Sequence, residues 1–146
     1  MALAFHHVAA VTRDADVSSA WYQHTFALRP IWTLRSFSPL TKARLPGLTR
    51  IDELAVPGLR IHLMEVPGTS VAPDLASFAL FQHTCVAVDS RDELRALQER
   101  AATAKGSAAA PTEIVVDNDG VESFYAKDPD ALEWEVTWVP AGVQDR

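Results

Sequence analysis

The chain has 146 residues, of which 48% are hydrophobic and 22% are charged, and its formal net charge is −6. This length suits a single domain with its own hydrophobic core, and the acidic balance argues against nucleic acid or an anionic membrane as a partner. Cys85 is the only cysteine, so no internal disulfide can form. No basic leader or long apolar run is present, so we expect neither a signal peptide nor a membrane span. Together these features favour a cytoplasmic protein.

The first half of the chain predicts a strand, a helix and three further strands. The helix is expected at 14–28, behind the candidate caps Asp14 and Asp16, with apolar residues at helical spacing: Val17, Ala20, Trp21 and Ala27. A Pro-Gly pair in the stretch 49–68 indicates a turn between two strands. The remaining expected elements of this half are strands at 5–12 and 29–37, a loop at 38–48 and a connector at 69–80.

The second half predicts the same order of elements. Ser90 and Glu93 form a capping box at the start of a helix expected at 90–104, and Gly106 ends it. Leu94, Leu97 and Ala101 make the apolar stripe of this helix. The expected strands are 81–89, 110–117, 121–128 and 132–139.

The two halves therefore resemble an internal repeat. "HVAAVTRDADVSSAW" can be aligned with "HTCVAVDSRDELRAL", and the two leading histidines are 76 positions apart. A repeat of this kind determines the architecture. The sequence predicts an α+β fold in which a single domain, 1–146, contains two pseudo-symmetric βαβββ modules at about 4–67 and 80–140.

Each module begins with a histidine at the head of a strand. Neighbouring residues on a strand point to opposite faces, so only one of His6 and His7 can face a given cavity. The repeat selects His7, because His7 aligns with His83. Small residues such as Ala9 and Cys85 then share the inward face, which leaves space above each sheet.

The last strand of each module carries a polar residue between apolar neighbours. His62 follows His7 by 55 positions, and Glu135 follows His83 by 52 positions. If the apolar neighbours pack against helices, His62 and Glu135 face the opposite way. Brought together, the four side chains make a site of three imidazoles and one carboxylate. Such a donor set suits one divalent transition metal (Zn, Mn, Co, Ni or Fe) better than Mg or Ca.

The sequence resembles the vicinal oxygen chelate superfamily, which includes glyoxalase I, methylmalonyl-CoA epimerase, fosfomycin-resistance proteins and extradiol dioxygenases. The most specific match is the final one, because the family places an Asp-Pro-Asp-Gly-Asn turn before the strand with its ligand glutamate. Here residues 128–130 match, Ala131 and Leu132 replace Gly and Asn, and Glu135 stands at the ligand position. The matching stretches are "HHVAAVTRDADVSSAWYQHTFAL", "VPGLRIHLMEVPG", "FQHTCVAVDSRDEL" and "FYAKDPDALEWEV".

The resemblance implies paired modules that form a cupped mixed sheet around one metal, with dimers as the usual assembly. It gives ligand roles to His7, His83 and Glu135, whereas His62 stands where glyoxalases and epimerases of the family usually have Glu or Gln. Four ligands leave two open positions on a six-coordinate ion, which suits a bidentate substrate and proton transfer beside a carbonyl. Without His62, the remaining three residues match the 2-His-1-carboxylate set of iron dioxygenases.

The general base is expected on the strand before His62, where related epimerases carry an acidic residue. Asp52 and Glu53 are the candidates, and only one can face the cavity. Glu53 faces inward if Leu54 packs against the helix, and Asp52 does so if the turn shifts the register by one. Glu135 is a candidate for the opposite base, as its family counterparts are.

The expected function is that of a metal-dependent epimerase, acting beside a ketone or thioester carbonyl of an acyl-CoA, keto-sugar or keto-cyclitol. The alternatives are a glyoxalase-type lyase, an extradiol dioxygenase, or a non-catalytic module that sequesters a drug such as bleomycin. The expected partners are a small molecule with vicinal oxygens and a second copy of the chain. Tyr125 and Trp134 are expected to pack within the sheet rather than to contact substrate.

Overall fold

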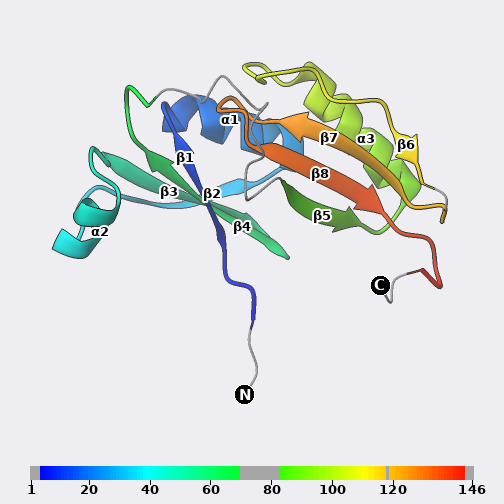
Figure 1. The fold of residues 1–146 in the computed structure, drawn as a ribbon, viewed down its shortest axis with the longest axis horizontal. Coiled ribbons are helices and arrows are strands. Elements are labelled where there is room, and N and C mark those ends of the chain that lie inside the picture. The colour runs from blue at the N-terminus through cyan, green and yellow to red at the C-terminus, as the bar shows by residue number, and fades with distance from the viewer. Residues whose placement is uncertain (1–3, 70–82, 118, 144–146) are drawn as a thin grey trace. The chain divides into compact units, whose positions relative to one another are not determined.

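The computed structural model describes residues 4–69, 83–117 and 119–143 (Figure 1). The chain divides into two compact units, Met1–Val71 and Ala72–Arg146, and each unit is described by itself. The connector expected at 69–80 lies, from residue 70 onward, outside the described residues, as do the first two positions of the strand expected at 81–89. None of the described helices is long and apolar enough to cross a membrane.

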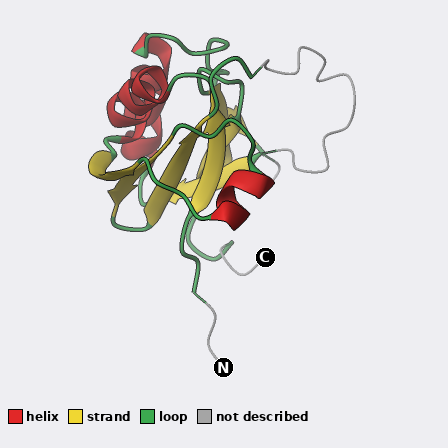
Figure 2. Ribbon diagram, turned by 90° about the vertical axis from the view of Figure 1, so that its left-hand side faces the viewer, coloured by secondary structure: helices red, strands yellow, loops and turns green. Residues whose placement is uncertain are grey.

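Each unit contains one four-stranded mixed sheet with the same topology. In the first unit the strand order is β1-β4-β3-β2, and in the second it is β5-β8-β7-β6. The outer strand that begins each unit runs parallel to its neighbour, and the other pairs are antiparallel. Figure 2 draws the strands in yellow and the helices in red. This shared topology confirms the prediction of two βαβββ modules in an α+β fold.

Apart from one additional short helix, the elements occur in the predicted order. The first unit contains β1 (Val8–Thr12), α1 (Ala15–Phe26), β2 (Arg29–Leu34), α2 (Pro39–Arg44), β3 (Arg50–Val56) and β4 (Leu59–Glu65). The second unit contains β5 (Thr84–Val88), α3 (Arg91–Thr103), β6 (Val115–Val116), β7 (Glu122–Lys127) and β8 (Glu133–Trp138). Helix α1 packs on β3 and β4, and α3 packs on β5, β7 and β8.

Helix α1 begins where the sequence predicts, but it buries a different face. The Asp14 side chain accepts hydrogen bonds from two backbone N–H groups of the first turn, as an N-cap does. Trp21 is buried as expected, whereas Val17 and Ala20 are exposed. Ser18 is buried in their place, because its hydroxyl lies 2.7 Å from that of Thr12 and is satisfied there.

The hairpin of β3 and β4 sets the register of the first sheet. Gly58 supplies the left-handed conformation at the turn, with φ +86°, and Val56 pairs with Leu59 on either side of it. Continued along the hairpin, this register places Glu53 directly opposite His62. Leu54 is fully buried on the face that carries α1, together with two residues of β4, Ile61 and Leu63.

Two elements differ from the sequence prediction. The segment 38–48, expected as a loop, contains α2, whose first turn is capped by the Ser38 hydroxyl and starts with Pro39. The strand expected at 110–117 is reduced to the two residues of β6. Both differences lie beside sheet edges and leave the order of the core strands unchanged.

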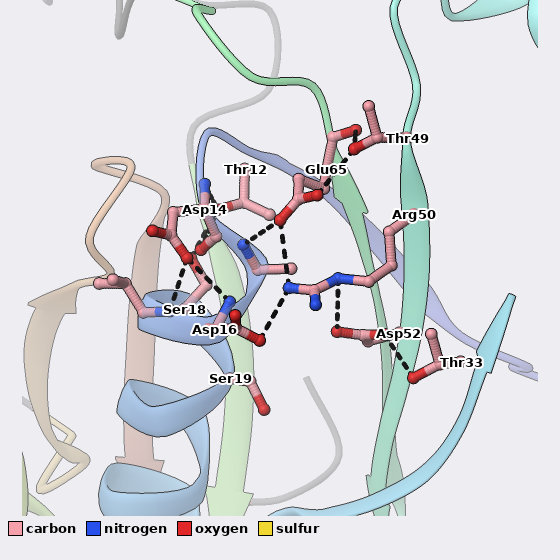
Figure 3. Close-up of polar contacts among 12 residues, drawn as sticks. Thr12, Asp14, Asp16, Ser18, Ser19, Thr33, Thr49, Arg50, Asp52 and Glu65 are labelled. Carbon is pink, nitrogen blue, oxygen red and sulfur yellow. Dashed lines mark hydrogen bonds and ion pairs between the residues drawn. The ribbon is translucent and has the colours of Figure 1, made fainter. Parts of the chain in front are cut away.

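A charged network ties α1 to β3 and β4 on the helix-bearing face of the first sheet (Figure 3). The buried Arg50 guanidinium contacts Asp16 at 2.9 Å, Glu65 at 3.1 Å and Asp52 at 3.3 Å. Glu65 also accepts a hydrogen bond from the backbone N–H of Ala15, at the start of α1. Each charged group of this network thus has a partner of opposite charge, and burying a charge without a partner would be costly.

The second unit is built around α3 and the turn between β7 and β8. Ser90 caps α3 through the N–H of Glu93, as its capping-box pattern predicts. In the turn, one Asp128 oxygen accepts hydrogen bonds from the N–H groups of Asp130 and Leu132. Ala131 adopts a left-handed φ of +68°, at the position where the related turn has glycine.

Candidate metal-binding site

His7 and His62 lie together on the face of the first sheet that points away from α1. His62 is on β4. His7 lies within the strand expected at 5–12, but the observed strand β1 begins one residue later, at Val8. Their rings stack with centroids 3.8 Å apart and an interplanar angle of 16°. His6 Nδ1 also lies 2.7 Å from His7 Nδ1. The first unit thus brings together the two ligand candidates that the sequence placed in it.

Glu53 is the direct partner of His62 across the two strands. Its Oε2 atom lies 2.8 Å from His62 Nε2 and 3.5 Å from a guanidinium nitrogen of Arg60. The Glu53 side chain is only 3% exposed, so this carboxylate depends on these contacts. Asp52 points to the other face, where it contacts Arg50 and Thr33. Of the two carboxylates expected on β3, Glu53 therefore shares a face with His62.

Trp32 adds a further contact to the His62 ring. Its ring centroid lies 5.0 Å from that of His62 in an edge arrangement, and it comes from β2, where it pairs in register with Glu53 of β3. His62 thus meets a stacked ring, an aromatic edge and a carboxylate from three different segments of the unit. These contacts fix the plane of the imidazole.

His83 and Glu135 form the corresponding pair of the second unit. His83 immediately precedes β5, as His7 precedes β1, and Glu135 is on β8. His83 Nε2 lies 3.1 Å from Glu135 Oε2. Cys85 pairs in register with Glu135 on the same face. The residue is accessible to solvent, while its thiol is partly buried beside the carboxylate.

Tyr125 is a residue of this face that the sequence reasoning assigned only to packing. It lies opposite Glu135 in the β7–β8 register, and its hydroxyl donates a hydrogen bond of 3.3 Å to Glu135 Oε1. Its ring meets that of His83 edge-on at 5.8 Å. Trp134, by contrast, is fully buried as expected. The internal repeat could have indicated this role for Tyr125. Tyr125 and Glu53 both lie on the third strand of their module, across from a ligand candidate.

The electrostatic environment shifts the pKa values of three side chains on these faces. Partial burial, followed by the neighbouring charges of His62 and His6, lowers the pKa of His7 and favours the neutral imidazole that binds metals. Burial and the Glu135 carboxylate raise the pKa of Cys85 to about 12, so its thiol stays protonated. The same two causes raise the pKa of Tyr125, which keeps its hydroxyl a donor.

In the second unit, the chemistry and spacing of the candidate ligand pair fit a divalent transition metal. Two ligand atoms bound at about 2.0–2.2 Å to adjacent positions on one ion lie roughly 3 Å apart. His83 Nε2 and Glu135 Oε2 are separated by such a distance, 3.1 Å. Within the described residues, no group of three or more His, Cys, Asp or Glu side chains is arranged to hold a metal ion.

Comparisons with known proteins agree with this fold. The family model of the Glyoxalase/Bleomycin resistance protein/Dioxygenase superfamily matches residues 4–136. A glyoxylase/bleomycin resistance protein/dioxygenase domain from Frankia sp. EAN1pec superimposes with a TM-score of 0.76 at 23% identity, covering 96% of this chain and 100% of that one. No curated protein sequence matches the chain.

Two further solved structures have named activities. The fosfomycin resistance protein FosX from Listeria monocytogenes, complexed with Mn(II) and sulfate, gives a TM-score of 0.66 at 20% identity and covers 100% of both chains. Lactoylglutathione lyase from Agrobacterium tumefaciens gives a TM-score of 0.60 at 19% identity and covers 92% of both chains. At these identities the comparisons establish the fold that this chain shares with them.

Proposed function

Because the chain belongs to the Glyoxalase/Bleomycin resistance protein/Dioxygenase superfamily, we propose that it is a metal-dependent epimerase. The substrate is an acyl-CoA, keto-sugar or keto-cyclitol with two neighbouring oxygens. A bound divalent metal supplies Lewis-acid stabilisation of the negative charge that develops when a proton leaves the carbon beside the carbonyl. The observation that carries this proposal is the presence, on the face away from the helix, of a pair of metal-competent side chains in each unit.

The proposed ligands are His7 and His62 from the first unit and His83 and Glu135 from the second. Each pair combines a residue that precedes the first strand of its unit with one on the fourth strand. The Glu53 contact occupies Nε2 of His62, so Nδ1 is the nitrogen that remains for the metal. A carboxylate that holds the second nitrogen of a histidine ligand is a common feature of metal sites.

The proposed general base is Glu53. It is nearly fully buried, and its contacts with His62 and Arg60 both involve Oε2, which leaves Oε1 to receive a proton. Asp52 was the other candidate, but its two oxygens contact Thr33 and Arg50 on the opposite face. Glu135 returns a proton from the other side of the substrate carbon in this proposal, since epimerisation needs two acid–base groups.

The test begins with metal binding by purified protein and by His62→Ala. We expect wild type to bind one Mn(II) or Zn(II) per chain in a calorimetric titration after chelator treatment, and the variant to bind it much more weakly. His24→Ala removes an exposed imidazole from α1 and provides the matched control. Uptake of no transition metal by wild type would exclude the enzymatic proposal and leave the drug-binding module.

The reaction is tested by proton exchange. Wild type loaded with metal should exchange deuterium from D₂O into the carbon beside the carbonyl of its thioester or ketone substrate. Glu53→Gln should abolish this exchange while metal remains bound, because the amide cannot accept the proton. Exchange at the wild-type rate in Glu53→Gln would show that Glu53 is not the general base.

Extradiol dioxygenase activity is the second candidate, favoured by the Glu53 contact itself. If Glu53 holds His62 away from the metal, then His7, His83 and Glu135 form a 2-His-1-carboxylate set. Oxygen consumption with Fe(II) and catechols, together with unchanged metal affinity in His62→Ala, would select this function over the epimerase. Glyoxalase-type lyase chemistry would use the same four ligands as the epimerase.

We also propose that the chain works as a single domain of two modules, 4–67 and 80–140, and as a cytoplasmic homodimer. The family model spans most of both modules, and the single cysteine fits a reducing compartment. The edge strand β2 has exposed apolar residues, Ile31, Trp32 and Leu34, which suit pairing with another copy. Light scattering at two protein concentrations checks the dimer, and a monomeric mass at both would exclude it.

A further inference from the structure

We propose that Tyr125 is a positioning residue that orients the Glu135 carboxylate for metal binding by holding one of its oxygens. This inference rests on the proposed function, because it assigns to Tyr125 a role toward a proposed ligand. Its structural basis is the hydrogen bond of 3.3 Å from the Tyr125 hydroxyl to Glu135 Oε1.

The two oxygens of Glu135 have different partners. Oε1 accepts the Tyr125 hydrogen bond, whereas Oε2 lies 3.1 Å from His83 Nε2. A carboxylate on a single β-strand can rotate about its side-chain bonds, and a donor on one oxygen restricts that rotation. Tyr125 therefore directs Oε2 toward the histidine of the same unit, which makes Oε2 the ligating oxygen.

The backbone makes this contact a consequence of strand pairing. Tyr125 and Glu135 are register partners on β7 and β8, so their side chains leave the sheet on the same face and side by side. The Tyr125 ring also packs edge-on against His83, which limits the positions of its hydroxyl. One residue thus contacts both candidate ligands of the second unit.

The first unit provides an independent instance of the same arrangement. There the third-strand residue Glu53 is the register partner of the fourth-strand residue His62 and contacts its Nε2 at 2.8 Å. The partner differs in kind because the ligand differs: an imidazole N–H needs an acceptor, and a carboxylate needs a donor. Both units therefore place a hydrogen-bond partner of complementary chemistry across from the proposed ligand.

The experiment compares metal affinity in wild type and Tyr125→Phe, which removes only the hydroxyl. Chelator-treated full-length proteins are titrated with Mn(II), and the expected affinity of the variant is roughly ten- to a hundredfold lower. The absorption spectrum of the Co(II)-loaded variant should also change, because the freed carboxylate changes its coordination. Thr137→Val is the matched control, since it removes a buried hydroxyl of β8 that donates to the Glu122 backbone carbonyl.

A double-mutant cycle with Glu135→Gln separates positioning from a general effect on the fold. If Tyr125 acts through Glu135, Tyr125→Phe should produce little further loss of affinity in the Glu135→Gln background. Wild-type affinity and an unchanged Co(II) spectrum in Tyr125→Phe would overturn the inference and leave the proposed function standing. An equal loss in Thr137→Val would also overturn it. Failure of wild type to bind any metal would overturn both.

Discussion

Glu53 and His62 face each other across β3 and β4, with Glu53 Oε2 2.8 Å from His62 Nε2 on the side of the sheet opposite α1. Both residues of the pair belong to the first unit. Because the Glu53 side chain is almost completely buried, the loss of its partner leaves an acceptor with fewer hydrogen bonds in a protected environment. The pair therefore contributes to stability as well as to the proposed chemistry.

We predict that His62→Ala lowers the free energy of unfolding of the chelator-treated protein by about 1–3 kcal/mol, since it leaves the Glu53 carboxylate with one partner fewer. Replacing both residues by apolar ones, Glu53→Leu with His62→Phe, should cost less than the single change, because no buried polar group is then orphaned. Urea denaturation at neutral pH measures both values. A double variant less stable than His62→Ala would contradict the argument.

The Glu65 carboxylate predicts a specific acid sensitivity. Burial alone would raise its pKa, but hydrogen bonds from Ala15 and Thr49 and the Arg50 charge lower the pKa below its usual value. A carboxyl group with a depressed folded-state pKa stabilises the fold above its unfolded pKa, and this contribution is lost as the pH falls through the folded pKa. Wild type should therefore lose more stability between pH 7 and about pH 3 than Glu65→Gln does.

The control for this prediction is Asp16→Asn. Asp16 contacts the same Arg50 guanidinium at 2.9 Å, but its side chain is 85% exposed, so solvent screens the interaction. We expect this variant to retain nearly the whole acid dependence of wild type in denaturation curves recorded across the pH range. Equal flattening of the pH profile in both variants would show that Glu65 is not the titrating group.

The turn between β7 and β8 predicts a stabilising substitution. Ala131 has a φ of +68°, a conformation that costs a residue with a Cβ atom about 1–2 kcal/mol. Ala131→Gly removes that cost but adds chain entropy to the unfolded state, so we expect a net gain of about 0.5–1 kcal/mol. Ala87→Gly, in strand β5, should destabilise the protein instead. Thermal denaturation of the two variants compares the signs.

Cys85 predicts a slow reaction with alkylating reagents. A thiol with a pKa of about 12 is almost entirely protonated at pH 8.5, and the thiolate is the reactive form. In the chelator-treated protein, iodoacetamide should modify Cys85 more slowly than free cysteine, although the residue is exposed. Glu135→Gln removes a negative charge that raises this pKa, so it should accelerate alkylation. A wild-type rate equal to that of free cysteine, measured by mass spectrometry, would contradict this prediction.

The register that pairs Glu53 with His62 was accessible from the sequence. A Pro-Gly turn between two strands makes the residues on either side of it a pair, and counting outward from Val56 and Leu59 reaches Glu53 and His62. The choice between the two carboxylates then follows from the burial of Leu54. The pairing of β3 with β4 was the predictable part of the first unit, because a tight turn constrains the register of the strands that it joins.

The pairing of Tyr125 with Glu135 could not be derived by counting residues outward from a turn. The β7–β8 connection runs from Lys127 to Glu133, and its length does not by itself fix which residues pair. The buried face of α1 was misjudged for a different reason. Ser18 can be buried because its hydroxyl has a hydrogen-bond partner in Thr12, and Thr12 lies outside the helix, so the helical periodicity does not reveal it. Helix α2 was missed because the Ser-Pro signal at its start was assigned to a turn.

The two faces of the first sheet have different roles, and this division affects how the sequence of the protein can evolve. The ion pairs of Arg50 and the apolar packing under α1 lie on one face, while His62 and Glu53 lie on the other. Because side chains alternate along each strand, neighbouring codons specify residues on opposite faces of the sheet. Descendants of such a module can therefore acquire new ligands or new acids on the open face while the helix-bearing face continues to supply the folding energy. That separation makes the module a tolerant scaffold for the evolution of new reactions.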